Sequence, residues 1–209
     1  MRKILIISIV VLFFAGCENN DVESIKECFE IYKNSLLNIS GNEAIKVVDE
    51  NTIKYYSTML EYAQTIKYNE LQKLSLMNKI LVLTLRHILT LDELNKMNGE
   101  KLFIWAIDYG MISMQDTENL LLKDIVIDKN DRNQAKGLLV ASKYNIGYKI
   151  KFVKEQGSWK IDLTSMFNFA EKLFQTTRKQ LDMTEEQFIH ATLEEYGKEI
   201  DYNILYRNR

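Results

Sequence analysis

Residues 147–163 constrain the fold most, because their apolar residues alternate on both sides of a short turn. Strict alternation over this length is typical of half-buried β-strands. Gln156 and Gly157, between the two runs, favour a two-residue hairpin loop. The apolar residues that share the inner face are Tyr148, Ile150 and Phe152 in the first strand and Trp159, Ile161 and Leu163 in the second.

Pairing Glu155 with Ser158 sets the register of this hairpin. The pairs that then face each other are Phe152 with Ile161, Ile150 with Leu163, and Lys151 with Asp162. The first two pairs are apolar and the third joins opposite charges on the outer face, which is a favourable cross-strand arrangement. Two independent patterns therefore predict the same register.

Two further strands are predicted before the hairpin, at residues 123–128 and 134–142. A cluster of turn-forming residues at 129–133 separates them, and Gly137 indicates a β-bulge in the second strand. Helices first, then a curved antiparallel meander, then more helices is an α+β layout. We therefore expect N-terminal helices packed on a cone-like sheet, with extra helices at the C-terminus.

The segments from residue 22 to the predicted strands, and those after the hairpin, have helical periodicity. The predicted helical segments are about 22–39, 42–63 (with a break near Asn51), 69–89, 90–98, 100–109, 164–181 and 184–195. The segment at 69–89 is apolar nearly all round, which predicts burial. Two capping boxes are predicted, at Thr90 with Glu93 and at Thr184 with Gln187. Gly99 is predicted to end the helix before it.

The first residues differ from all that follow. Arg2 and Lys3 precede an uninterrupted apolar run at residues 4–14, and polar residues follow from Glu18 onward. This run is shorter than the roughly 20 residues that a membrane-spanning helix needs. A charged start, a short apolar middle and small residues describe a secretory signal peptide.

The segment Phe14-Ala15-Gly16-Cys17 resembles the lipobox of bacterial lipoproteins, although Leu is the commonest residue where Phe14 stands. In that family the leader is cut before the cysteine, and the cysteine thiol carries a diacyl anchor with fatty acids such as palmitate. The resemblance implies a lipoprotein signal peptide at 1–16, a lipidated Cys17 with a short tether at 17–21, and a place in the cell envelope, periplasmic or surface-facing. The alternatives are a plain signal peptide or a buried N-terminal helix.

Charge also narrows the class of partner. Removing residues 1–16 would leave 25 basic against 29 acidic residues. Such an acidic chain gains little from anionic lipid headgroups, so membrane attachment is expected to rest on the lipid anchor and not on a basic face. Nucleic acid is not an expected partner, because nucleic-acid binders are usually basic. Two cysteines exclude a disulfide scaffold, and we interpret Cys28 as a small apolar residue.

The stretch at 147–163, with its Phe-Val-Lys-Glu-x-Gly-x-Trp-Lys-Ile pattern, resembles the last hairpin of the nuclear transport factor 2-like superfamily. This cystatin-like (SnoaL-like) α+β cone is shared by ketosteroid isomerase, scytalone dehydratase and many secreted bacterial proteins. The resemblance implies a cone-like domain at 22–163, with residues 164–209 as a C-terminal helical extension. The hairpin motif reports the fold rather than an activity, because its residues mostly pack or turn.

Enzymes of this superfamily move protons with an acid and hydroxyl groups inside the cone. Asp108 and Tyr109 are the candidates for that chemistry here, and the alternative is a helix end with a solvated carboxylate. Tyr144, Tyr148 and Trp159 are the candidates for ligand binding. His87 and His190 have no metal-ligand spacing, and nucleotide and serine-hydrolase motifs are absent, so neither a metal nor a cofactor is expected.

Lysines at 143, 149, 151, 154 and 160 are placed to form a positive outer face of the sheet. Glu155 and Asp162 lie among them, which favours an ordinary solvated face. The resulting hypothesis is a membrane-anchored, non-enzymatic lipoprotein that binds an envelope protein or a small apolar ligand. The alternatives are an isomerase- or dehydratase-type enzyme and an envelope immunity or inhibitor protein.

Overall fold

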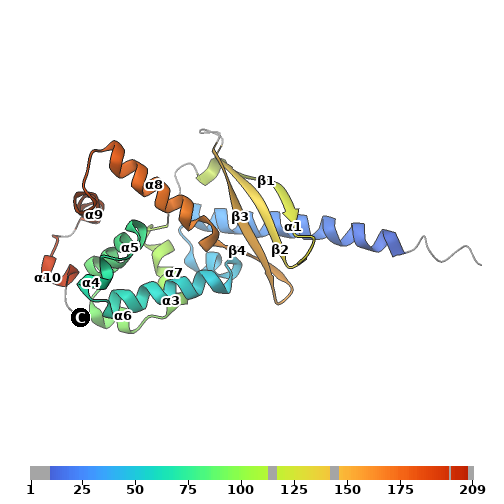
Figure 1. The fold of residues 1–209 in the computed structure, drawn as a ribbon. Helices are drawn as coiled ribbons and strands as arrows, with labels where there is room; N and C mark the ends of the chain where they lie inside the picture. The colour runs from blue at the N-terminus through green and yellow to red at the C-terminus, as the bar shows by residue number, and fades with distance from the viewer. Residues whose placement is uncertain (1–9, 113–116, 142–145, 198, 207–209) are drawn as a thin grey trace, which may run out of the picture. The chain divides into compact units, whose positions relative to one another are not determined.

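Figure 1 shows the protein as a computed structural model, which describes residues 10–112, 117–141, 146–197 and 199–206. Residues 10–19, 141, 146, 203 and 204 are described by their backbone alone. The chain forms two compact units: Met1–Asp49 with Ile107–Ser165, and Glu50–Ala106 with Met166–Arg209. The fold is α+β, as the sequence predicts, with an antiparallel sheet and helices at both ends of the chain.

The sheet of the first unit is an antiparallel meander with strand order β1-β2-β3-β4. Its strands are β1 (Leu120–Ile127), β2 (Gln134–Ala141), β3 (Ile146–Glu155) and β4 (Ser158–Asp162). The predicted hairpin register is confirmed, since Glu155 pairs with Ser158 and Phe152 with Ile161. Gln156 and Gly157 have φ angles of 49° and 84°, the two positive values that a type I′ hairpin loop requires.

One of the predicted cross-strand pairs does not form, at the end of β4. This strand stops at Asp162, and Leu163 begins the short helix η3 (Leu163–Met166), so the pair between Ile150 and Leu163 does not form. Lys151 does lie opposite Asp162. However, the Asp162 carboxylate is buried and accepts a hydrogen bond from the backbone N–H of Thr164 at 3.0 Å. Asp162 therefore turns the chain out of the sheet.

The β-bulge lies in β1 and not, as predicted, in β2. The register shifts between Lys123 and Val126, so two residues of β1 face Gly137. One of them, Asp124, has a φ of 48°, which only a locally bent strand accommodates. Gly137 has a different role, because a Cβ atom there would collide with the Leu122 side chain. The glycine allows β1 and β2 to pack closely beside the bulge.

Helix α1 (Val10–Leu37) lies against one face of this sheet (Figure 1). The shorter elements of the unit are α2 (Gly41–Ala44), η1 (Ile45–Val47) and η2 (Thr117–Asn119). The core residues between α1 and the sheet are Ile25, Cys28, Phe29 and Tyr32 from the helix and Leu120, Leu139, Ile150, Phe152 and Ile161 from the strands. The break predicted near Asn51 lies slightly earlier, where Val48 forms a bridge with Ile161.

The second unit is helical. Its elements are α3 (Glu50–Thr65), α4 (Tyr68–Leu71), α5 (Leu76–Ile88), α6 (Leu91–Asn95), α7 (Gly99–Asp108, whose last two residues belong to the first unit), α8 (Phe167–Gln180), α9 (Glu185–Glu194) and α10 (Tyr202–Leu205). Both predicted capping boxes are present, at the starts of α6 and α9. The C-terminal helices expected as an extension lie in this unit with residues 50–106.

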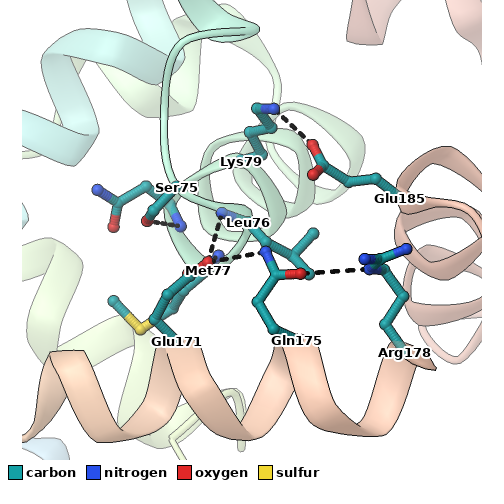
Figure 2. A network of polar contacts seen from close by, with 9 residues as sticks. Ser75, Leu76, Met77, Lys79, Glu171, Gln175, Arg178 and Glu185 are labelled. Atoms are coloured by element: carbon teal, nitrogen blue, oxygen red, sulfur yellow. Dashed lines mark hydrogen bonds and ion pairs between the residues drawn. The ribbon is translucent and has the colours of Figure 1, made fainter. Parts of the chain in front are cut away.

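The helix predicted at 69–89 is two helices, α4 and α5. Ser75 caps α5 and accepts a hydrogen bond from Asn78. Glu171 of α8 reinforces this start, because its carboxylate accepts the N–H groups of Leu76 at 3.2 Å and Met77 at 2.8 Å (Figure 2). Burial raises the pKa of Glu171, but these hydrogen bonds outweigh it and leave the pKa lowered. A carboxylate at a helix N-terminus also offsets the helix dipole.

Gly99 does not end a helix, as was predicted, but begins α7. A Cβ atom at this position would lie 2.6 Å from the backbone oxygen of Ile53 in α3. The glycine is needed because the backbones of α3 and α7 approach each other closely. This requirement comes from a residue 46 positions away in the sequence, so local sequence analysis could not detect it.

Candidate functional site

A polar clamp joins α1 to the last hairpin of the sheet, close to the predicted lipidation site. The carboxylate of Asp21 accepts hydrogen bonds from Lys154 Nζ at 2.7 Å and from Trp159 Nε1 at 2.9 Å. The Lys154 ammonium also lies 5.6 Å from the centre of the Trp159 ring, within the range of a cation–π contact. Cys17 is four residues earlier in α1, and its side chain lies outside the described part of the protein. Residues 17–21, expected as a tether, are helical here.

The electrostatics of the clamp favour an ionised Asp21. Burial raises the pKa of the Asp21 carboxyl group, but the hydrogen bonds from Lys154 and Trp159 and the charge of Lys154 outweigh it, so the pKa is lowered from 3.8. Because the pKa is lower in the folded state than in the unfolded state, ionised Asp21 stabilises the fold at pH values above the ordinary pKa of 3.8. That contribution is lost as the pH falls through the lower, folded-state value.

We predict that Asp21→Asn lowers the free energy of unfolding at neutral pH by about 1–3 kcal/mol, because the hydrogen bonds lose their charged acceptor. The difference between variant and parent should shrink as the pH falls below 3.8, where the parent carboxyl group also becomes protonated. Urea denaturation at a series of pH values measures this. Glu23→Gln, at an exposed position of the same helix, is the control and should change stability little. An Asp21→Asn effect that does not vary with pH would contradict the assignment.

The two candidate catalytic residues are neighbours at the point where α7 ends. Asp108 lies at the end of α7, where its Oδ1 accepts the backbone N–H of Gly41 at 2.6 Å. That contact holds the start of α2, so the structure gives Asp108 a capping role. Tyr109 follows on the surface with 42% of its area exposed.

Of the candidate ligand-binding residues, Tyr144 lies outside the described residues. Tyr148 is half-buried on the face of the sheet that packs against α1, and burial raises its pKa to about 12. Trp159 is buried and belongs to the polar clamp. Both side chains therefore help to fill the space between helix and sheet. Cys28 packs there as well, and burial raises its pKa to about 12, which keeps it a thiol.

The lysines predicted on the outer sheet face separate into groups. Lys149 and Lys151 are exposed there as predicted. Lys154 is on the opposite face, in the polar clamp, because it shares the strand parity of Phe152. Lys160 donates a hydrogen bond to the carbonyl oxygen of Lys46. Lys143 lies outside the described residues.

Sequence analysis missed a cavity of about 350 Å³ in the second unit. Its lining residues are Tyr68, Leu71, Gln72, Lys79, Leu83, Thr184, Glu185, Glu186, Ile189 and Tyr206. Lys79 is 7% exposed, and its Nζ lies 2.5 Å from Glu185 Oε1 (Figure 2). Apolar side chains beside paired charges and tyrosines suit a small amphipathic ligand. The available signal was a lysine inside the apolar helix predicted at 69–89.

The histidines have separate environments. His190 Nδ1 lies 2.9 Å from the hydroxyl oxygen of Tyr202, whereas His87 lies in the last turn of α5. In the part of the chain that the structure describes, no three His, Cys, Asp or Glu residues are grouped to hold a metal ion. Among the same residues, no helix combines the length and the apolar character needed to cross a membrane.

The chain matches no family model, no curated protein and no solved structure at a significant level. The arguments on function below therefore depend on its own residues.

Proposed function

We propose that this protein is a bacterial cell-envelope lipoprotein, anchored by acylation of Cys17, that binds a partner protein or a small ligand without catalysis. The observation that carries the proposal is the segment Phe14-Ala15-Gly16-Cys17 directly after a short apolar run and before polar residues. Two acyl chains on Cys17 would anchor it stably, since one chain alone binds a membrane only marginally.

The polar clamp supports this role. Asp21 is only four residues from Cys17 and is bonded to two residues of the last hairpin. An acylated Cys17 would therefore hold the sheet of the first unit close to the lipid headgroups. Such a short connection suits a protein that works at the membrane surface and not one that reaches far from it.

The contacts of the candidate side chains, and a cavity in the second unit, support a binding role. Asp108 holds the start of α2, and Trp159 is bonded to Asp21 of α1, so both side chains have structural partners. The cavity beside Lys79 and Glu185 offers room for a small ligand. We further propose that the sheet of the first unit is related to the nuclear transport factor 2-like superfamily, on the strength of the hairpin motif and its register.

We predict that Cys17→Ser abolishes incorporation of labelled palmitate and moves the protein from the membrane fraction to the soluble fraction of a bacterial host. The full chain with its leader is expressed, and mass spectrometry identifies the N-terminus and its acyl groups. Cys28→Ala is the matched control, because Cys28 is the chain's other cysteine and is buried. That control should remain labelled and membrane-bound. Retained labelling of Cys17→Ser, or an uncut leader in the parent, would overturn the proposal.

A further inference from the structure

We propose that the outer face of the sheet binds anionic lipid headgroups through Lys123, Lys136, Lys149 and Lys151, which we call the lysine face. The choice of a membrane as the partner rests on the proposed anchor at Cys17. The proposal goes beyond that anchor, because it gives the domain a preferred lipid and a preferred orientation on the membrane.

The strand register brings these lysines together. Lys123 of β1 pairs with Leu138, which pairs with Lys149 of β3. In the next row of the same face, Lys136 of β2 pairs with Lys151. These four lysines come from three strands and are all exposed. Neighbouring strands lie about 4.8 Å apart, so the positive charges form one compact surface.

Acidic side chains do little to neutralise the lysine face. In the described residues, no hydrogen bond or ion pair joins the ammonium groups of its four lysines to another side chain; the backbone N–H of Lys151 donates to Ser165 Oγ at 3.1 Å. Asp162 is on this face, but it is buried and bonded to Thr164. The exposed acid Asp124 lies at the bulge between Lys123 and Val126, and Glu155 lies at the hairpin end.

Apolar residues are interleaved with the lysines. Leu121 is 45% exposed and Val126 is 62% exposed. Both lie on β1, beside the lysine rows. Basic side chains around exposed apolar groups are the combination that binds at the interface of an anionic bilayer.

The short distance between Cys17 and the polar clamp favours a membrane over an acidic protein as the partner of the lysine face. Cys17 is four positions before Asp21, which is bonded to the sheet. As a helix this segment spans about 6 Å, and fully extended it spans at most about 14 Å. The polar clamp lies on the opposite face of the same sheet, so an acylated Cys17 would raise the concentration of headgroups around the whole sheet, the lysine face included. A diffusing acidic partner has no such advantage.

The test uses the chain from residue 17 with Cys17→Ser, so that binding cannot come from an acyl chain. We measure its partitioning onto vesicles of phosphatidylcholine alone and of phosphatidylcholine mixed with phosphatidylglycerol. Binding should require the anionic lipid and should weaken with added salt. Lys136→Gln with Lys149→Gln should lower the partition coefficient about 25-fold, which is about five-fold for each lysine removed.

The matched control is Lys67→Gln with Lys96→Gln, because these exposed lysines carry the same charge but lie in the second unit. This control should bind anionic vesicles like the parent. Equal binding of the parent to both vesicle types, or an equal loss in the control, would overturn the lysine face. Neither result bears on the proposed acylation of Cys17, because palmitate labelling tests that proposal separately.

Discussion

Replacing Arg86 with alanine is expected to lower the free energy of unfolding of the second unit by about 3–5 kcal/mol. Arg86 is 1% exposed. Its guanidinium group donates to the carbonyl oxygens of Ala63 at 2.9 Å, Tyr62 at 3.1 Å, Ile66 at 2.7 Å and Leu205 at 3.0 Å. Three of these carbonyls are at the end of α3, where the last helical carbonyls lack intrahelical partners; the Tyr62 oxygen also accepts the backbone N–H of Ile66 at 3.0 Å. Alanine would leave the buried carbonyls of Ala63, Ile66 and Leu205 without their guanidinium donors and would leave a cavity beside them.

Amide hydrogen exchange read by mass spectrometry measures this effect locally, in peptides from α3 and α10. Arg86→Lys is expected to restore little, because an ammonium group cannot spread its donors over four carbonyls as the planar guanidinium does. Lys54→Ala, at an exposed position of α3, controls for the loss of a long cationic side chain and should leave protection unchanged. Similar protection in Arg86→Ala and Lys54→Ala would refute the role of Arg86.

Replacing Phe152 with alanine is expected to lower the free energy of unfolding of the first unit by about 3–5 kcal/mol. Phe152 is fully buried and pairs with Ile161, which is also fully buried. Removing the ring would leave a cavity between the sheet and α1. The two tryptophans make the measurement specific, because Trp159 is in the first unit and Trp105 is in the second. In a Trp105→Phe background, the fluorescence of Trp159 during urea denaturation reports on the first unit.

Lys151→Ala is the control for this prediction. Lys151 precedes Phe152 on β3 but faces the opposite side of the sheet and is exposed. Its replacement should change the stability by no more than about 0.5 kcal/mol. A comparable loss in both variants would mean that the inner and outer faces of β3 are assigned wrongly.

The hairpin of β3 and β4 could be predicted because its information is local. Alternation with a period of two decides which side chains share a face, and a two-residue loop leaves one register that keeps Phe152 opposite Ile161. The capping boxes at Thr90 and Thr184 are local for the same reason, since each is completed within four residues. The burial of α5 could also be predicted from its apolar sequence.

The functional candidates were harder to place, because a side chain's role depends on residues far away in the sequence. Asp108 appeared as an acid in an apolar stretch, but its partner is the N–H group of Gly41. Lys154 appeared to be one of several surface lysines, but its partner is Asp21. Lys79 was not noticed at all, since only the packing of α9 brings Glu185 to it.

The sequence by itself therefore determined the α+β class, the hairpin register from Lys151 to Ser158 with its partners, and the capping boxes, because these depend on neighbours within a turn or a strand pair. Tertiary structure alone decided that residues 69–89 divide at Ser75, that Gly99 begins a helix, and that four lysines share an exposed face. Each of these depends on a contact or a strand pairing between distant segments. Local propensity carries no information about such contacts, because they form only when the chain packs.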